Sequence, residues 1–159
     1  MNLQNIGVIG AGTMGNGIAQ VCAMAGFNVT LLDISESALQ KAVATVGKNL
    51  DRQIAKQTLT PEQKQATLDK IRTSTDYSVL RDAQLVIEAA TENLDLKLRV
   101  LQQIAAQVGS ECVIASNTSS LSITQLAASV SQPERFIGLH FFNPVPVMGL
   151  IEVIRGLQT

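Results

Sequence analysis

A glycine-rich turn between two short apolar segments is the feature that most limits how this chain can fold. Residues 5–10 (NIGVIG) form an apolar run that ends in glycine, as a buried strand often does. The small residues of 13–25 indicate a helix that ends at Gly26, and the β-branched run 28–33 (NVTLLD) indicates a second buried strand. A strand, a helix and a strand within about 30 residues form a βαβ unit, which requires a parallel sheet with a right-handed crossover.

The rest of the chain continues this alternation, with one insertion. Apolar residues recur at helical spacing from 38 to 54, and a second helix begins at Thr60-Pro61-Glu62, with Thr60 as its N-cap. This stretch, residues 36–71, is too long for a simple crossover and predicts a helical hairpin that projects from the sheet edge. Further strands are predicted at 71–76, 85–90, 112–116, 135–141 and 150–154, and further helices at 94–108 and 123–129. The predicted fold class is therefore α/β: a Rossmann-like, doubly wound, mainly parallel sheet with an inserted helical hairpin, in one domain over residues 1–159.

Charge and composition exclude several classes of partner. The 12 basic and 13 acidic residues give a net charge of −1 and form no Lys/Arg block, which argues against a nucleic-acid partner. No apolar stretch approaches the ~18–20 residues of a membrane span, and Met1–Gly10 lacks the charged segment of a signal peptide. Cys22 and Cys112 lie far apart in apolar segments, as buried reduced thiols do. We therefore expect a cytoplasmic protein without a membrane partner or a metal site.

The turn Gly10-Ala11-Gly12-Thr13-Met14-Gly15 has the GxGxxG spacing, and it stands where a strand ends and a helix begins. In that position the first glycine permits a tight turn, the second lets a pyrophosphate approach the backbone, and the third lets helix and strand pack closely. Asp33 ends the second strand, where a carboxylate can accept hydrogen bonds from ribose hydroxyls and repel a 2′-phosphate. This pattern favours NAD as cofactor. FAD binding, or a ligand-free turn with Asp33 as a helix cap, remain alternatives.

Polar residues near two later strands predict a catalytic site. Ser116-Asn117-Thr118-Ser119-Ser120 follows a strand at the edge of the sheet where such folds bind ligands, although a helix cap also explains it. His140 is the only histidine and lies in an apolar strand, where a structural role is the alternative. Glu152, in the apolar segment LIEVI, is expected to be buried and to need a partner. If the two strands are adjacent, the glutamate orients the imidazole and the histidine moves a proton.

Four segments together resemble one known family: GVIGAGTMGNGIAQ, IEAATENLDLK, ASNTSSLSIT and GLHFFNPVPVMGLIEVI. The chain is similar over essentially its whole length to the short-chain L-3-hydroxyacyl-CoA dehydrogenases, which include bacterial 3-hydroxybutyryl-CoA dehydrogenases. The resemblance implies hydride transfer between NAD and C3 of a (S)-3-hydroxyacyl-CoA or 3-ketoacyl-CoA, in fatty-acid or short-chain acyl-CoA metabolism. A non-catalytic NAD-binding module is the alternative, and other hydroxyacid dehydrogenases with the same sheet usually employ a lysine base.

The resemblance also assigns roles by position. It implies cofactor contacts at Gly10, Ala11, Gly12, Thr13, Met14, Gly15, Asp33, Glu92, Lys97, Ser119 and Asn143. The catalytic residues implied are His140 as base, Glu152 as its orienting acid and Ser119 as the hydrogen-bond partner of the substrate's 3-oxygen. Lys56, with Asn49 at a position where some relatives have serine, is implied in CoA binding.

The family normally continues into a C-terminal helical domain that holds subunit contacts and closes the substrate cleft. We expect residues 1–159 to form the NAD-binding domain without that helical domain, and hence to be weakly active or inactive alone. An apolar edge near Val147–Ile154 is then expected to be exposed and to promote self-association as a homo-oligomer.

Overall fold

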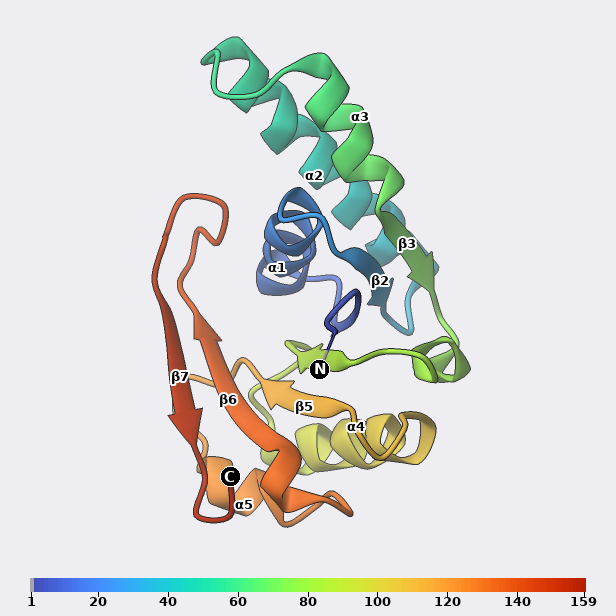
Figure 1. Cartoon of the computed structure of the whole chain (residues 1–159), viewed down its shortest axis with the longest axis vertical. Helices are drawn as coiled ribbons and strands as arrows, with labels where there is room; N and C mark the ends of the chain where they lie inside the picture. The colour runs from blue at the N-terminus through green and yellow to red at the C-terminus, as the bar shows by residue number, and fades with distance from the viewer. Residues whose placement is uncertain (1) are drawn as a thin grey trace.

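One sheet organises the whole molecule. The computed structural model describes residues 2–159, and within them seven strands pair in the order β3-β2-β1-β4-β5-β6-β7 (Figure 1). The strands are β1 (Asn5–Ile9), β2 (Asn28–Leu32), β3 (Ile71–Ser74), β4 (Leu85–Glu88), β5 (Val113–Ser116), β6 (Phe136–Phe141) and β7 (Ile151–Arg155). All neighbours pair in parallel except β6 and β7, which are antiparallel. The predicted Rossmann-like, mainly parallel sheet is confirmed.

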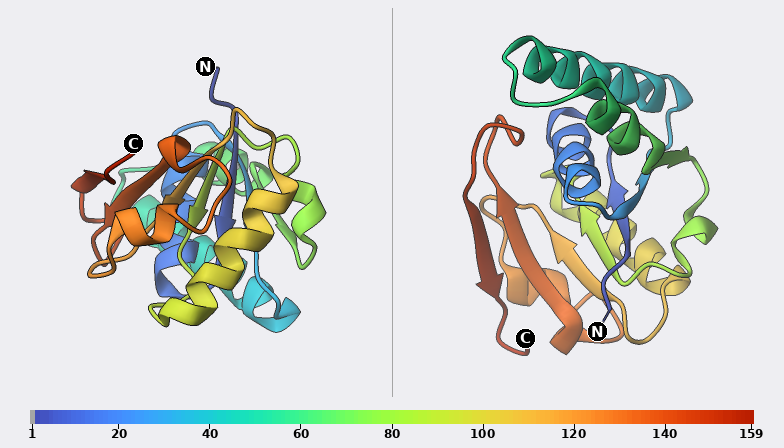
Figure 2. Two further views of the ribbon diagram at one scale, coloured as in Figure 1. Left: turned by 90° about the horizontal axis from the view of Figure 1, so that it is seen from below. Right: turned by 45° about the horizontal axis from the view of Figure 1, so that its top comes forward.

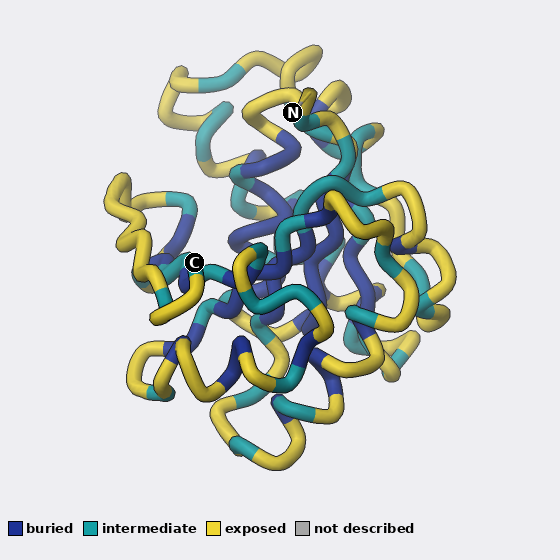
Figure 3. The backbone as a smooth tube through the Cα atoms, turned by 60° about the horizontal axis from the view of Figure 1, so that its bottom comes forward, coloured by how far each residue is buried: buried dark blue, intermediate teal, exposed yellow. Residues whose placement is uncertain are grey.

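Helices cover both faces of this sheet (Figure 2). They are α1 (Thr13–Met24), α2 (Glu36–Ala55), α3 (Pro61–Asp69), α4 (Leu94–Gln107) and α5 (Ile123–Ala127), with single 3-10 turns at Tyr77–Leu80 and Pro133–Arg135. One apolar core joins α1 and α2 to the sheet, and a second lies under α4 and α5. Since the central strands are buried on both faces, their sequences are continuous apolar runs (Figure 3).

The insertion between β2 and β3 is a helical hairpin, as predicted. Helices α2 and α3 lie side by side and extend beyond the sheet (Figure 1). Thr60 Oγ1 accepts a hydrogen bond from the Gln63 backbone N–H, and the Gln63 side chain accepts one from the Thr60 N–H. This reciprocal capping box starts α3 sharply after the turn.

Strand β7 corrects one sequence-based expectation. The segment LIEVI was expected to bury the Glu152 carboxylate, but all five residues of β7 are exposed, and Glu152 is 53% exposed. The strand lies at the edge of the sheet with β6 as its sheet neighbour (Figure 1). An apolar edge strand has the same residue composition as a buried one, so the pattern alone could not distinguish them.

The strand order reverses direction between β1 and β4, because the chain moves outward first through β2 and β3 and then through β4 to β7. In open α/β sheets the crevice at such a switch point, at the carboxyl ends of the strands, is where ligands bind. The glycine turn follows β1 at this edge. No helix within residues 2–159 is long and apolar enough to cross a membrane.

Candidate active site

The glycine turn after β1 is held by close backbone packing. Gly10 has φ +101°, a conformation that side chains disfavour, and its N–H donates to the Leu32 carbonyl of β2 at 2.8 Å. A Cβ on Gly15 would lie 1.6 Å from the Gly10 carbonyl oxygen, so α1 can approach the turn only with glycine there. A Cβ on Gly12 would meet nothing within 4 Å, which leaves its backbone open to a ligand.

Helix α1 presents its N-terminus at this open backbone. In the part of the chain that the structure describes, no side chain caps α1 at Gly12 and no acidic residue lies in its first turn. Unpaired N–H groups and the positive end of the helix dipole favour an anion such as a pyrophosphate. Asp33 lies beside the turn: its Oδ2 accepts from the Ala11 N–H at 2.8 Å and its Oδ1 from the Ser35 N–H at 2.9 Å. These two hydrogen bonds fix the carboxylate, which keeps further lone pairs for ribose hydroxyls.

A cleft of about 580 Å³ connects these groups. Of the predicted cofactor residues, Ala11, Gly12, Thr13, Asp33 and Asn143 line it, together with Ala90 and with Lys41 and Thr45 of α2. The cleft thus joins the anion site at α1 to a carboxylate at β2 and, on the other side, to the loops after β4 and β6. A dinucleotide is elongated, and it requires an anion site for its pyrophosphate and hydrogen-bond acceptors for its ribose hydroxyls. The residues present therefore fit NAD.

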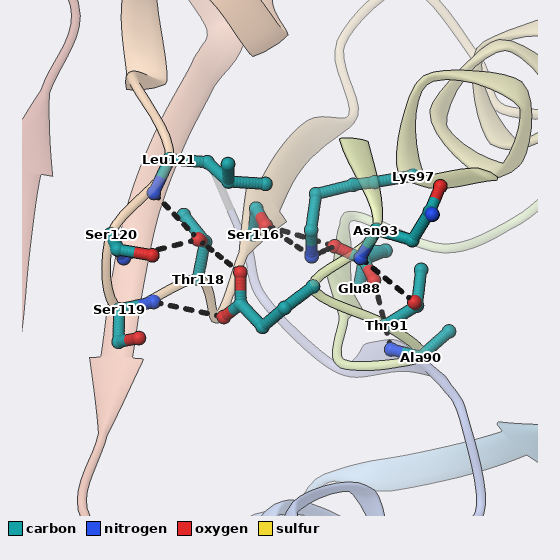
Figure 4. Close-up of polar contacts among 11 residues, drawn as sticks. Glu88, Ala90, Thr91, Asn93, Lys97, Ser116, Thr118, Ser119, Ser120 and Leu121 are labelled. Atoms are coloured by element: carbon teal, nitrogen blue, oxygen red, sulfur yellow. Dashed lines mark hydrogen bonds and ion pairs between the residues drawn. The ribbon is translucent and has the colours of Figure 1, made fainter. Parts of the chain in front are cut away.

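Two residues that the resemblance implies in cofactor binding, Met14 and Lys97, have side chains packed toward the interior. The Met14 side chain packs against the apolar core on the α1 face and does not line the cleft within the described chain. The Lys97 ammonium is 1% exposed and forms a buried ion pair with Glu88 (Figure 4). The helical spacing of α4 explains why Lys97 is buried: it lies on the inner face of the helix, alongside Val100, Leu101 and Ile104.

His140 and Glu152 stand directly opposite each other on β6 and β7. The His140 Nδ1 and Glu152 Oε2 are 2.8 Å apart, and the imidazole is 20% exposed. Phe142 packs against the ring, with centroids 4.6 Å apart. With Glu152 accepting from Nδ1–H, the Nε2 lone pair is the one available for a substrate proton. The predicted pair is therefore brought together, although by an exposed edge strand rather than a buried one.

Ser119 lies on the loop after β5, and its backbone is fixed by Glu92. The Ser119 N–H donates to Glu92 Oε1 at 3.0 Å, and the Thr118 hydroxyl donates to Glu92 Oε2 at 2.8 Å. Both carboxylate oxygens of the predicted cofactor ligand Glu92 thus accept hydrogen bonds from this loop. Thr118 Oγ1 also accepts from the Leu121 N–H at 3.0 Å (Figure 4). The same loop contacts β6, where the Phe141 N–H donates to Asn117 Oδ1 at 2.8 Å.

A second depression of about 300 Å³ lies along α2 beside the two-proline loop. The predicted residues Asn49 and Lys56 both line it, and so do Arg52 and Gln53. Asn49 is held from both sides: its Nδ2 donates to the buried Gln20 Oε1 at 3.1 Å, and its Oδ1 accepts from Arg52 at 3.4 Å. Sequence reasoning missed Arg52, although the i, i+3, i+4, i+7 spacing from Asn49 to Lys56 places these residues on one helix face.

Other titratable groups do not favour nucleophilic chemistry. Burial raises the pKa of the Cys22 thiol to about 11, and burial likewise raises the pKa of Cys112 to about 11, against a smaller lowering by Arg135. Both thiols are free, and both stay protonated at neutral pH. Burial first, and then the charges of Asp33 and Glu88, raise the pKa of Tyr77.

The family described as "3-hydroxyacyl-CoA dehydrogenase, NAD binding domain" matches residues 5–159. A 3-hydroxybutyryl-CoA dehydrogenase of Bradyrhizobium diazoefficiens is 48% identical over 157 residues, which cover 99% of this chain and 54% of that protein. A 3-hydroxyadipyl-CoA dehydrogenase of Escherichia coli is 45% identical over 159 residues, which cover all of this chain and 34% of that protein. This chain therefore spans about half or less of the length of these relatives.

Solved structures agree with this similarity. The crystal structure of (S)-3-hydroxybutyryl-CoA dehydrogenase from Ralstonia eutropha superimposes with a TM-score of 0.98 at 58% identity, covering 99% of this chain and 56% of that one. A 3-hydroxybutyryl-CoA dehydrogenase from Escherichia coli gives a TM-score of 0.97 at 45% identity, covering 100% of this chain and 34% of that one. The match includes every element that forms the cleft and the His140–Glu152 pair.

Proposed function

Because the chain belongs to the 3-hydroxyacyl-CoA dehydrogenase family, as its NAD-binding domain, we propose that it serves hydride transfer between NAD and C3 of a (S)-3-hydroxyacyl-CoA or 3-ketoacyl-CoA. The observation that carries this proposal is the 2.8 Å His140–Glu152 hydrogen bond on the strands that follow the dinucleotide cleft. A binding module without catalysis would have no need for an oriented imidazole at this edge. The oxidoreductase reading is therefore favoured over the non-catalytic one.

Different residues bind different parts of the cofactor. NAD, when bound, supplies the hydride acceptor or donor. Ala11, Gly12 and the α1 N-terminus bind its pyrophosphate, Asp33 binds its adenosine ribose, and Asn143 borders the opposite part of the cleft. The Asp33 carboxylate would repel a 2′-phosphate, which supports NAD over NADP. Glu92 would contribute to cofactor binding by holding the loop that carries Ser119.

Proton transfer at the substrate is assigned to His140. In the direction of oxidation, Nε2 takes the proton of the 3-hydroxyl as the hydride leaves C3, and Glu152 stabilises the imidazolium. In reduction, the imidazolium returns that proton to the 3-oxygen. The Ser119 hydroxyl hydrogen-bonds the same oxygen and orients C3, while its backbone is held by Glu92.

The depression along α2 supports an acyl-CoA as substrate. Arg52 and Lys56 place two cations beside it, and Pro144, Pro146 and Val147 supply an apolar wall. Phosphate groups and an adenine ring match this combination of charge and apolar surface. We assign Lys56 and Arg52 to phosphate contacts, and Asn49 to holding Arg52 in place.

The test joins residues 1–159 to the C-terminal part of the Bradyrhizobium 3-hydroxybutyryl-CoA dehydrogenase, in place of that protein's own matching segment. We expect this chimera to oxidise NADH with acetoacetyl-CoA, followed at 340 nm, and the isolated chain to do so weakly or not at all. A folded chimera that binds NADH but leaves acetoacetyl-CoA unreduced would contradict the proposal.

Asp33→Ala tests the cofactor assignment. We expect NADH affinity to fall about tenfold or more, since one charge-assisted acceptor for the ribose hydroxyls is lost. The preference for NADH over NADPH should shrink as well, because the charge that repels a 2′-phosphate is gone. Fluorescence titration of the isolated chain with both cofactors measures the two effects. Unchanged NADH affinity would show that Asp33 does not bind the cofactor.

We propose further that a helical domain covers the exposed apolar surface around β7 in the whole enzyme. That surface includes Val147, 77% exposed, and Val153, 62% exposed, with Met148, Leu150 and Ile151 between them. An apolar patch of this kind marks an interaction site. Alone, the chain is expected to form homo-oligomers through it, and Val153→Glu is expected to reduce this. Sedimentation showing a monomer at high concentration would contradict the prediction.

A cytoplasmic location is also proposed. The two free thiols, Cys22 and Cys112, support a reducing compartment.

A further inference from the structure

The end of β6 carries the proposed base, and it extends beyond the strand that pairs with it. The parallel ladder between β5 and β6 ends at the Ser116–Gly138 pair, whereas β6 continues through His140 to Phe141. Strand β7 still pairs with this end of β6 on the other side, but β5 has given way to the loop of residues 117–122 (Figure 1). The side of β6 that faces β5 therefore needs a hydrogen-bond acceptor from outside the ladder.

The side chain of Asn117 supplies that acceptor. Its Oδ1 accepts from the Phe141 N–H at 2.8 Å, and its own backbone N–H donates to the Glu88 carbonyl of β4 at 2.8 Å. Phe141 is 6% exposed and belongs to the apolar core, so water has little access to replace the Asn117 amide. One residue thus ties the end of β6 to the ends of β4 and β5.

The two groups that must meet at the substrate lie on either side of this hydrogen bond. Ser119 follows Asn117 by two residues, on the loop after β5. His140 precedes Phe141, and the carbonyl of His140 shares a peptide plane with the N–H that Asn117 binds. Glu152 holds the imidazole from β7, but it has no contact with the β5 loop among those described. Loss of the Asn117 amide would therefore let His140 and Ser119 shift relative to each other.

We propose that Asn117 is a positioning residue that aligns His140 with Ser119, so that both reach the 3-oxygen of one bound substrate. Asn117 takes no part in the proton transfer, and it does not line the dinucleotide cleft among the described residues. This proposal rests on the proposed function, because it deepens the description of that same site. A hydrogen bond that only stabilised the fold could join two strands anywhere in the sheet. This one lies between the two groups that contact the reacting oxygen, where alignment sets the rate.

Gln84 offers a matched comparison at the opposite edge of the sheet. Its Oε1 accepts from the Asn5 backbone N–H at 2.8 Å, so it too is a half-buried amide that binds the backbone of a neighbouring strand. This bond joins the amino ends of β1 and β4, away from the carboxyl ends where His140 and Ser119 lie. Loss of either amide leaves a backbone N–H without its acceptor, but only loss of the Asn117 amide is expected to affect the reacting groups.

The experiment measures kcat and KM for acetoacetyl-CoA reduction in the chimera described above, together with Tm and NADH affinity, for each variant. We expect Asn117→Ala to lower kcat about tenfold or more, and to leave KM and NADH affinity within about threefold. Asn117→Asp keeps an oxygen in place to accept from the Phe141 N–H, so kcat should return to within about threefold of the starting chimera. Gln84→Ala should lower Tm about as much as Asn117→Ala does, with kcat within about twofold.

The kinetic results can overturn the proposal in four ways. Asn117→Ala with lower Tm but unchanged kcat would make the hydrogen bond merely stabilising, and so would an equal loss of kcat in Gln84→Ala. An Asn117→Asp chimera as slow as Asn117→Ala would show that Asn117 does not act through the Phe141 N–H. If Asn117→Ala does not fold, Asn117→Leu is measured instead, since leucine has the same branched shape without an acceptor. Failure of both variants to fold would contradict a role in alignment.

Two readouts on the isolated chain separate this proposal from the proposed function, because they need neither cofactor nor substrate. Amide hydrogen exchange at Phe141 should be faster in Asn117→Ala and return to its original rate in Asn117→Asp. His140 is the only histidine, so its ring-nitrogen NMR signals are identified directly. On the neutral ring, the share of the Nδ1–H tautomer, which Glu152 favours, should fall in Asn117→Ala and stay unchanged in Gln84→Ala.

The two proposals then fail in different ways. A folded starting chimera without activity contradicts the proposed function, while the isolated chain still tests how Asn117 holds the end of β6. An Asn117→Ala chain with unchanged exchange at Phe141, or with an unchanged His140 tautomer, would overturn the alignment role whatever the activity of the chimera.

Discussion

His140→Gln is expected to lower kcat for acetoacetyl-CoA reduction by about 10³-fold in the chimera described above, within the range usual for loss of a general acid or base. Glutamine keeps a similar size and hydrogen-bonding capacity on β6 but cannot carry the proton between Nε2 and the 3-oxygen. NADH affinity should stay within about threefold, because His140 does not line the dinucleotide cleft among the residues described. Initial rates at 340 nm and NADH titration measure the two quantities separately.

Glu152→Gln is the matched variant for this pair. Its amide oxygen can still accept from the imidazole Nδ1–H, but the charge that stabilises the imidazolium is lost. We expect a loss of kcat that is clearly smaller than that of His140→Gln. If His140→Gln retains activity within tenfold of the starting chimera, another residue moves the proton and the assignment is wrong.

Gly15→Ala is expected to destabilise the domain by about 3 kcal/mol or more, at or beyond the upper end of ordinary overpacking. The added Cβ would lie 1.6 Å from the Gly10 carbonyl oxygen, which is backbone and has no rotamer to escape into. Helix α1 would have to move away from β1, which opens the turn that binds pyrophosphate. Thermal unfolding should show Tm lowered by about 6 °C or more, since 1 kcal/mol corresponds to about 2–4 °C at this size.

Two other glycines provide controls for that result. An alanine at Gly12 meets no atom within 4 Å, so Gly12→Ala should keep its Tm while its methyl group obstructs the cofactor and weakens NADH binding. Gly47 lies within α2, also with open space around it, so Gly47→Ala should raise stability by about 0.5–1 kcal/mol and leave binding unchanged. Equal Tm values for Gly15→Ala and Gly12→Ala would contradict the packing argument.

The local parts of this fold could be predicted from the sequence because their signals are local. The βαβ unit around the glycine turn needs only a strand, a turn and a helix in order, and the Thr60–Gln63 capping box needs two residues three positions apart. The mainly parallel sheet then follows from the alternation of strands and helices.

The environment of single side chains could not be predicted in the same way. Glu152 was expected to be buried because its segment is apolar, yet that segment is the exposed edge strand. The resemblance implies a cofactor contact for Lys97, but its partner Glu88 is known only once α4 is packed against the sheet. Ser116 meets Glu88 across 28 positions of sequence, through the pairing of β5 with β4. Edge exposure and long-range pairing depend on the tertiary arrangement, which residue patterns do not specify.

We propose that NAD binds this folded domain in the cleft that runs from Asp33 past the glycine turn to Asn143. Titration of the isolated chain with NADH and with NADPH, followed by cofactor fluorescence, tests it most directly. We expect saturable binding of NADH with one site per chain, and binding of NADPH at least tenfold weaker. No saturable binding of NADH to the folded chain, or equal affinity for both cofactors, would contradict the claim.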